Sequence, residues 1–391
     1  MPCSRCRECH DRGDKFCIYC GEILSYPRSG CDKCQECIQN GDTYCRYCGK
    51  RLVPFPDGTC DRCRESRARG DVFCRYCGRR LKDDENPLMF IGFIVGMVTV
   101  ALLISILLFE YCVALWGIPQ VLPNISNYGS TLILVTPWIV DIATFDGVLS
   151  QIYYILLIIA ITLVIGTLLY KAAGPCGDLF NGDTKKIRET ALFEVPVLFA
   201  SLYICEFVFV LILSAMGVSV DSLPDRDTWI WMYELLEASV WEEVITRILL
   251  IGLPMVIIGL AYKKEGKSSW KYLLGGFGFN RTVIILIFIS AFIFGAGHLN
   301  NWGWWKFFPT FAFGLIAGYL FSKYGVYATI AMHFMTDYMS AEAWLLGTES
   351  PVACALLIMM VSIACIPYVF IYVRKGVLAL RDIFTQSNGL K

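Results

Sequence analysis

The chain has 391 residues, of which 56% are hydrophobic and only 17% are charged. That balance excludes an ordinary soluble globular domain and predicts membrane-spanning segments. The formal net charge is zero, which excludes a global electrostatic attraction to nucleic acid.

Cysteines and apolar residues are separated along the chain. Fourteen of the 19 cysteines lie at or before Cys77, whereas the first apolar run begins only at Leu88. We therefore expect no secretory signal peptide. The sequence predicts a polar, cysteine-rich head that meets an apolar body near Asn86 and Pro87.

Residues 1–26, 27–54 and 55–82 repeat one cysteine pattern, which is C-x2-C, ten residues, then C-x2-C-G. Two such knuckles supply four thiolates, a closed tetrahedral shell for Zn²⁺. Each unit is too short to bury a core, so metal binding is expected to supply its folding energy. We predict three small β-type zinc ribbons and about three zinc ions. The expected ligands are Cys3, Cys6, Cys17 and Cys20, then Cys31, Cys34, Cys45 and Cys48, then Cys60, Cys63, Cys74 and Cys77.

Two alternatives stay open in the head. Cys9 and Cys37 are extra cysteines, replaced by Ser66 in the third repeat, and Cys9 could take the place of Cys3. A disulfide scaffold is the alternative to zinc, although paired knuckles without a signal peptide argue against it. Zinc sites with four thiolates would change the head's charge of +3 to about −3. We expect a structural role or a protein partner for the ribbons, and the charge argues against nucleic acid.

Apolar stretches in the body predict about eight membrane-spanning helices, since a span needs roughly 20 apolar residues. The stretch 132–145 is apolar but contains Pro137 and Asp141, so we expect an interfacial or re-entrant segment there. The predicted spans are 88–116, 150–170, 191–216, 240–262, 282–298, 307–323, 326–346 and 352–373.

Loop charges predict the orientation in the lipid bilayer. With the head inside, the inner loops 171–190, 263–281 and 323–325 and the tail carry fourteen Lys and Arg residues, and the outer loops carry two. Because cytoplasmic loops are enriched in these residues, both termini are expected to be cytoplasmic. The expected chain is an all-α polytopic integral membrane protein with three N-terminal ribbons.

Ionisable side chains in the predicted spans are costly in lipid and need a reason. Glu110 and Glu194 lie near span ends, where we expect them to reach the interface, while Glu206 is expected to bond inside the bundle. The others fall in three clusters on separate spans. These are W-E-E-V-I-T-R at 241–247, F-I-F-G-A-G-H at 292–298 and H-F-M-T-D at 333–337.

In the first cluster, Glu243 and Arg247 are four residues apart and share a helix face, which predicts an internal ion pair. Glu242 is turned about 100° away and faces another group.

In the other two clusters, Phe294 shares a face with His298, and His333 shares a face with Asp337. Two of the chain's three histidines thus lie in apolar spans. Together with acids on three helices, they favour a polar site inside the bundle.

The patterns E-E-x-x-x-R, F-x-x-x-H and H-x-x-x-[ND], in this order, resemble the CPBP family. The family comprises the CAAX prenyl proteases of the second type and bacteriocin-processing and immunity proteins. The resemblance covers about residues 190–375 and leaves out the ribbons. It implies an intramembrane endopeptidase that cleaves a membrane-associated protein or peptide with a water nucleophile.

On this resemblance, Glu242 and His298 would hold and activate the water as general base. His333 and Asp337 would stabilise the oxyanion or position the substrate. An active-site metal stays open, because Glu and His also serve as ligands; a metal-free glutamate mechanism is slightly favoured. The supporting residues would be Glu243, Arg247 and Phe294.

Asp337 departs from the CAAX proteases, which carry Asn at this position. Ionised Asp only accepts hydrogen bonds, so Asp337 would help an oxyanion only if protonated through burial. Alternatively it orients His333 or binds a metal. Loop charges also place Glu242 and His298 near outer span ends, with His333 and Asp337 closer to mid-bilayer, so prenyl-protein specificity is not carried over.

Two other functions stay open. A non-catalytic membrane scaffold or immunity-type protein would keep the motifs and bind a partner through the ribbons. A transporter would use the acids as an ion path, but we find no paired repeats with broken helices. The body is expected to comprise a linker with two spans (83–190), a protease core (191–375) and a cytoplasmic tail (376–391).

Overall fold

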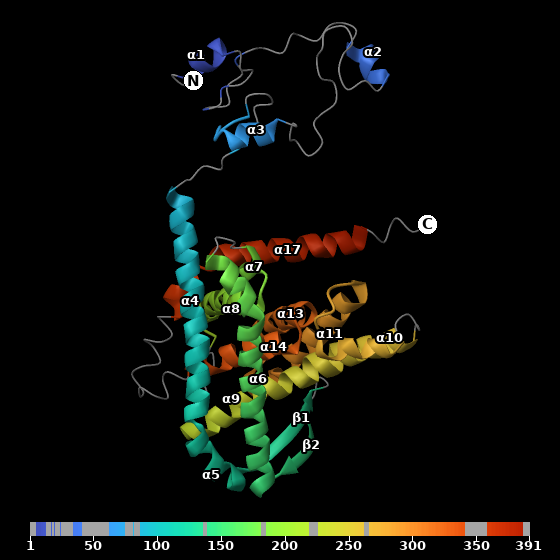
Figure 1. Cartoon of the computed structure of the whole chain (residues 1–391). Helices are drawn as coiled ribbons and strands as arrows, with labels where there is room; N and C mark the ends of the chain where they lie inside the picture. Colours follow the sequence, from blue (N-terminus) through green and yellow to red (C-terminus); the bar gives the residue numbers. More distant parts are fainter. Residues whose placement is uncertain are drawn as a thin grey trace. The chain divides into compact units, whose positions relative to one another are not determined.

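The computed structural model (Figure 1) consists of two compact units, Met1–Gly92 and Phe93–Lys391, and each is described by itself. The structure describes residues 5–12, 17, 19, 24, 34–40, 62–74, 81, 87–135, 139–180, 185–218, 226–261, 266–340 and 358–385.

Each predicted ribbon contributes one short helix to the described part of the head. These are α1 (Cys6–Asp11), α2 (Cys34–Gln39) and α3 (Cys63–Ala68), and each begins at a cysteine that the repeat assigns as a ligand. The other predicted ligands Cys3, Cys20, Cys31, Cys45, Cys48, Cys60 and Cys77 lie outside the described residues.

Buried sulfurs gather in the first repeat. Cys6, Cys9 and Cys17 form one buried cluster, in which the Cys9 and Cys17 sulfurs are 3.8 Å apart. Ser66, at the position of Cys9, is likewise buried in the third repeat. Within the described ranges, no three or more His, Cys, Asp or Glu side chains are placed to hold a metal ion. The zinc sites therefore stay a prediction.

Four helices in the described part of the body are long and apolar enough to cross a membrane. The first three are α4 (Pro87–Trp116), α6 (Gly147–Phe180) and α8 (Ala191–Ala215). The fourth is continuous from Thr228 to Ala261 and consists of α9 (Thr228–Glu243), η2 (Val244–Gly252) and α10 (Leu253–Ala261). A shorter apolar helix, α11 (Arg281–Gly297), follows. The predicted number of about eight spans is not confirmed.

Two further helices, α13 (Phe307–Lys323) and α14 (Val326–Asp337), begin where spans were predicted. The 12 residues of α14 rise by only about 17 Å, less than the roughly 30 Å of a hydrocarbon core. Residues 328–335 of α14 are all buried, and the helix packs against α6, α8, α9 and α13. It is therefore a central helix of the bundle.

The fourth long helix differs from its prediction in two ways. It begins at Thr228, whereas the predicted span began at residue 240. The prediction began too late because the acidic residue Glu234 lowers the local hydropathy. In the structure Glu234 accepts hydrogen bonds from Arg226 and Tyr128 and is therefore accommodated. The segment η2 is π-helical, with backbone bonds that span five residues instead of four.

An antiparallel hairpin forms the segment at 132–145, and its interfacial or re-entrant position stays a prediction. Its strands are β1 (Ser130–Val135) and β2 (Ile139–Phe145). Two side chains of α9 fix β1, since Trp241 Nε1 donates to the Ile133 carbonyl (2.8 Å) and the Tyr233 hydroxyl donates to Ser130 Oγ (2.7 Å). The body is thus mostly helical, which fits the predicted all-α membrane protein, and it carries this one hairpin among its described residues.

The predicted last span, 352–373, is not one straight helix. Within its described part a turn at 364–365 precedes α17 (Ile366–Thr385), which continues beyond the predicted end. Tyr368 and Tyr372 of α17 pack against Phe193 and Val197 of α8, and α17 lies across one end of the bundle (Figure 1). The remaining short elements are α5 (Ile118–Tyr128), α7 (Lys185–Arg188), η3 (Gly266–Leu274), α12 (Leu299–Trp302), η4 (Trp304–Lys306) and η5 (Tyr338–Ser340).

The expectation that Glu110 and Glu194 reach the interface is wrong, because they are 0% and 2% exposed. Glu194 instead accepts hydrogen bonds from Lys323, Tyr319 and Tyr372. Glu206 lies 3.4 Å from the Lys306 ammonium, so it does have a partner within the bundle. Neighbouring helices therefore satisfy Glu194, an acid that seemed placed for water.

Candidate functional site

His333 of α14 lies at the centre of a group of carboxylates. Its Nδ1 is 3.0 Å from Glu243 Oε1. Its Nε2 is 3.4 Å from Asp337 Oδ2 and 3.8 Å from Glu242 Oε2. The helix α14 and the junction of α9 with η2 thus bring two of the three sequence clusters together around one imidazole.

Glu243 and Arg247 form the predicted ion pair, with Arg247 Nε 3.0 Å from Glu243 Oε2 and both side chains fully buried. Arg247 also donates to Ser290 Oγ of α11 (2.8 Å), and its guanidinium lies 5.5 Å from the centroid of the Phe294 ring. Because Glu243 bonds Arg247 with one oxygen and His333 with the other, it fixes the orientation of the imidazole.

Glu242 and Asp337 are the more open carboxylates of the group. Their side chains are 19% and 18% exposed, whereas that of Glu243 is 0% exposed. Asp337 Oδ2 also lies 3.1 Å from the Ser239 hydroxyl. Three carboxylates therefore face one guanidinium and one imidazole, so acceptor atoms outnumber charged donors. Such a site attracts further donors, for example water or a peptide N–H.

His298 caps the C-terminus of α11 beside this group. Its Nδ1 is 2.8 Å from the Phe294 carbonyl, which only accepts, so Nδ1 carries the proton and Nε2 of the neutral ring is free to accept. The Phe294 ring packs against both imidazoles, with centroid distances of 4.7 Å to His298 and 5.9 Å to His333. His298 also interacts electrostatically with His333 and Asp337. The third cluster thus joins the other two.

Two of these residues lie at other positions along their helices than we expected. Glu242 lies about 21 Å along the helix from Thr228, near the middle rather than at an outer end. Asp337 is the last residue of α14 and not a mid-span residue. His298 does follow the end of α11, as expected.

The choice between a metal and a metal-free mechanism at this site stays a prediction. Over the part of the chain that the structure describes, no group of three or more His, Cys, Asp and Glu side chains has its donors placed for one ion. Glu242 and Asp337 instead face the same imidazole nitrogen.

Sequence reasoning missed two serines of the site. Ser239 precedes Glu243 by four residues and Ser290 precedes Phe294 by four, so each lies on the same helix face as a residue already singled out. That spacing could have found both. The link between Glu243 and His333 joins two helices and has no such periodicity.

Residues 224–339 match the family model described as Type II CAAX prenyl endopeptidase Rce1-like. The match supports the CAAX-type protease family. It spans less than a third of the chain, includes every residue of the three clusters and leaves out the head. No curated protein and no solved structure matches the chain. The family match and the apolar helices together fit an integral membrane protease in general terms.

Proposed function

We propose that this protein is an intramembrane endopeptidase that hydrolyses a peptide bond of a membrane-associated protein or peptide. The observation that carries the proposal is the cluster of Glu242, His333 and Asp337 within 3.8 Å inside the matched region. Three buried or half-buried carboxylates around one imidazole are costly in a helix bundle, so a catalytic use explains their presence.

Water is the nucleophile in this proposal. Glu242 accepts one of its protons and the free Nε2 of His298 accepts a hydrogen bond from the other, which leaves a lone pair for the carbonyl carbon. The new C–O bond gives a tetrahedral oxyanion. Glu242 then returns its proton to the amide nitrogen as the C–N bond breaks, so the products are an acid and an amine.

His333 supplies positive charge to this reaction. Its two nitrogens face carboxylates of Glu243 and Asp337, which accept but do not donate, so a ring protonated on both nitrogens satisfies both. A cation held in this way stabilises the oxyanion. Asp337 is then a positioning residue for His333, while Arg247 holds Glu243 in place.

The proposal is tested in host cells, because the substrate is unidentified. We expect at least one membrane protein to be shortened with the wild-type chain and to stay full-length with Glu242→Gln or His298→Ala. Glu206→Gln is the matched control, since it changes an acid of the bundle outside the cluster. Loss of a general base lowers turnover by about 10²- to 10⁴-fold. Equal processing by the wild type and Glu242→Gln would refute the proposal.

The family model's name makes a prenylated C-a-a-X peptide the first defined substrate to try. Purified protein in vesicles is incubated with a farnesylated peptide and with the same peptide lacking the lipid. Faster cleavage of the farnesylated peptide assigns prenyl specificity. Equal cleavage of both shows that the lipid is not recognised.

For the head we propose three zinc ribbons that bind a protein partner. Burial of Cys6, Cys9 and Cys17 in one cluster supports this and favours Cys9 as a ligand. Metal analysis of the purified chain should give about three zinc ions, and Cys17→Ser should lower that number to about two. Disulfides in place of zinc would contradict the proposal.

A further inference from the structure

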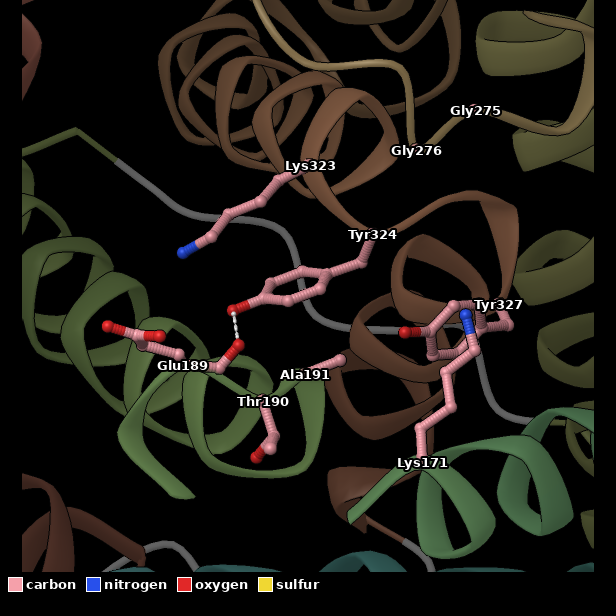
Figure 2. Close-up of a pocket in the computed structure, with 9 residues that line it drawn as sticks. All are labelled: Lys171, Glu189, Thr190, Ala191, Gly275, Gly276, Lys323, Tyr324 and Tyr327. Atoms are coloured by element: carbon pink, nitrogen blue, oxygen red, sulfur yellow. Dashed lines mark hydrogen bonds between the residues drawn. The ribbon is translucent and has the colours of Figure 1, made fainter. Parts of the chain in front are cut away.

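A cavity of about 420 Å³ lies where several helix ends of the body meet (Figure 2). It receives residues from α6, from the start of α8, from the end of α13 and from the start of α14. Its polar lining consists of Lys171, Glu189, Thr190, Lys323, Tyr324 and Tyr327.

This cavity is separate from the candidate active site. Tyr327 and His333 are both on α14, but the step of six residues from one to the other turns the helix by about 600°. That leaves them about 120° apart around the helix and about 9 Å apart along it. They therefore face different sides of the bundle.

Close backbone packing forms one wall of the cavity. Gly275 has a φ of +83°, and a Cβ there would lie 2.4 Å from the Phe321 carbonyl oxygen. Gly325 has a φ of +110°, and its Cβ would lie 2.8 Å from the Leu274 carbonyl oxygen. Since neither position accepts a side chain, the segment after η3 stays pressed against the turn between α13 and α14.

Lys171 on α6 has a positive charge that is available to a ligand in the cavity. Lys171 Nζ lies 4.5 Å from the centroid of the Tyr327 ring, and no carboxylate of the described residues is within ion-pair distance of it. Figure 2 shows the Tyr327 hydroxyl pointing toward the middle of the cavity and the Glu189 carboxylate pointing away from Lys171. An ammonium and a hydroxyl thus converge as donors, which suits an anion.

The polar side chains of Lys323 and Tyr324 already have hydrogen-bond partners. Lys323 donates to Glu194 (2.7 Å), and the Tyr324 hydroxyl donates to the Glu189 carbonyl (2.9 Å). Burial raises the pKa of Tyr324 above its ordinary value, so this hydroxyl stays neutral. Neither group repels an anion, and the N-terminus of α8 at Ala191 adds the favourable end of a helix dipole.

The position of the cavity favours a lipid as the source of that anion. Each of the three loops predicted on the cytoplasmic side contributes at least one lining residue. Along α6, the apolar or aromatic side chains of Leu156, Leu163 and Tyr170 are 56%, 66% and 83% exposed. Acyl chains would cover this strip, which ends beside Lys171. Anionic lipids are concentrated in the cytoplasmic leaflet and bind basic pockets between helices.

We propose that this cavity binds the phosphate group of an anionic phospholipid, with Lys171 and Tyr327 as donors and the acyl chains along α6.

Native mass spectrometry of the purified full chain tests the proposal by counting bound lipids. The probes are dioctanoyl phosphatidic acid, dioctanoyl phosphatidylcholine and inorganic phosphate. The variants are Lys171→Gln and Tyr327→Phe, which keeps the ring under the ammonium. Lys375→Gln is the matched control, because Lys375 also lies over a tyrosine ring, at 5.2 Å from Tyr372, but on α17 outside the cavity.

We expect phosphatidic acid to bind the wild type and Lys375→Gln alike, and Lys171→Gln about tenfold more weakly, as for the loss of one charged hydrogen bond. Tyr327→Phe should weaken binding by a smaller factor. Equal binding to Lys171→Gln and the wild type would overturn the proposal. Equal binding of phosphatidylcholine would overturn it too, as would binding of inorganic phosphate without the lipid. Peptide cleavage is not part of this readout, so its outcome is independent of the proposed function.

Discussion

Two groups of buried carboxylates in the same bundle balance their donors and acceptors in opposite ways. At the start of α8, Glu194 alone meets Lys323, Tyr319 and Tyr372 at 2.7–2.9 Å, so a single acceptor group has three donors. Around His333, the three carboxylates of Glu242, Glu243 and Asp337 share one imidazole and Arg247.

This difference in the number of donors distinguishes a structural acid, Glu194, from the carboxylates of the candidate active site. A carboxylate with all its hydrogen bonds made stabilises the native packing and has no use for another ligand. A group with an excess of acceptors is completed by a donor from outside the protein. Burial alone therefore does not distinguish structural from catalytic acids, whereas the number of donors around them does.

The largest expected effect on stability comes from Arg247→Met. Glu243 would then be left as a buried charge without its guanidinium, which costs about 3–5 kcal/mol. The free energy of unfolding of the purified chain in detergent micelles measures this loss. The double variant Glu243→Gln with Arg247→Met should recover part of it, because the unpaired charge is removed. No recovery in the double variant would show that Arg247 acts by packing instead.

Glu194→Gln should cost less, about 1–3 kcal/mol. Lys323 is 31% exposed and can turn toward water when the ion pair is lost, and both tyrosines keep an acceptor in the amide oxygen. Peptide cleavage by this variant should equal that of the wild type once it is folded. Glu189→Gln, an exposed neighbour, is the control and should change stability by about 0.5 kcal/mol or less. A loss of cleavage in folded Glu194→Gln would remove the contrast between the two groups.

The smallest expected effect is that of Asp337→Asn. The change removes one of the three carboxylates around His333 and keeps a side-chain oxygen near the imidazole. Turnover should therefore change by about tenfold or less. Steady-state kinetics beside Glu242→Gln measures the difference. If Asp337→Asn loses as much activity as Glu242→Gln, Asp337 takes part in the reaction directly and does not only position His333.

Helix positions in the body followed from the sequence wherever an apolar run has clear ends. The start of α8 was predicted where its apolar run begins, and the Thr190 hydroxyl does cap it by accepting a hydrogen bond from the Phe193 N–H. The start of α9 was missed because the partners of Glu234 come from elsewhere in the chain. The hairpin at 130–145 was missed because an apolar run with Pro137 and Asp141 resembles a broken span.

The candidate site could be predicted as a set of residues but not as a network. Four-residue spacing predicted the pair of Glu243 with Arg247, and the order of the motifs grouped His333 with Glu242. Which carboxylate oxygen meets which imidazole nitrogen depends on how α14 packs against α9. The same holds for Glu194, whose tyrosine partners come from α13 and α17.

The π-helical segment η2 has a consequence for the length of the chain at this point. Its wider turns set the direction of Glu242, which precedes the segment, relative to that of Met255, which follows it along the same helix. Met255 packs in a second apolar cluster. Insertion of a single residue between Val244 and Gly252 would turn one half against the other by up to about 100°, because the segment is already wound in wide turns and cannot absorb another residue. Either the acid would leave His333 or Met255 would leave its neighbours. The number of residues in this segment is thus as constrained as their chemistry.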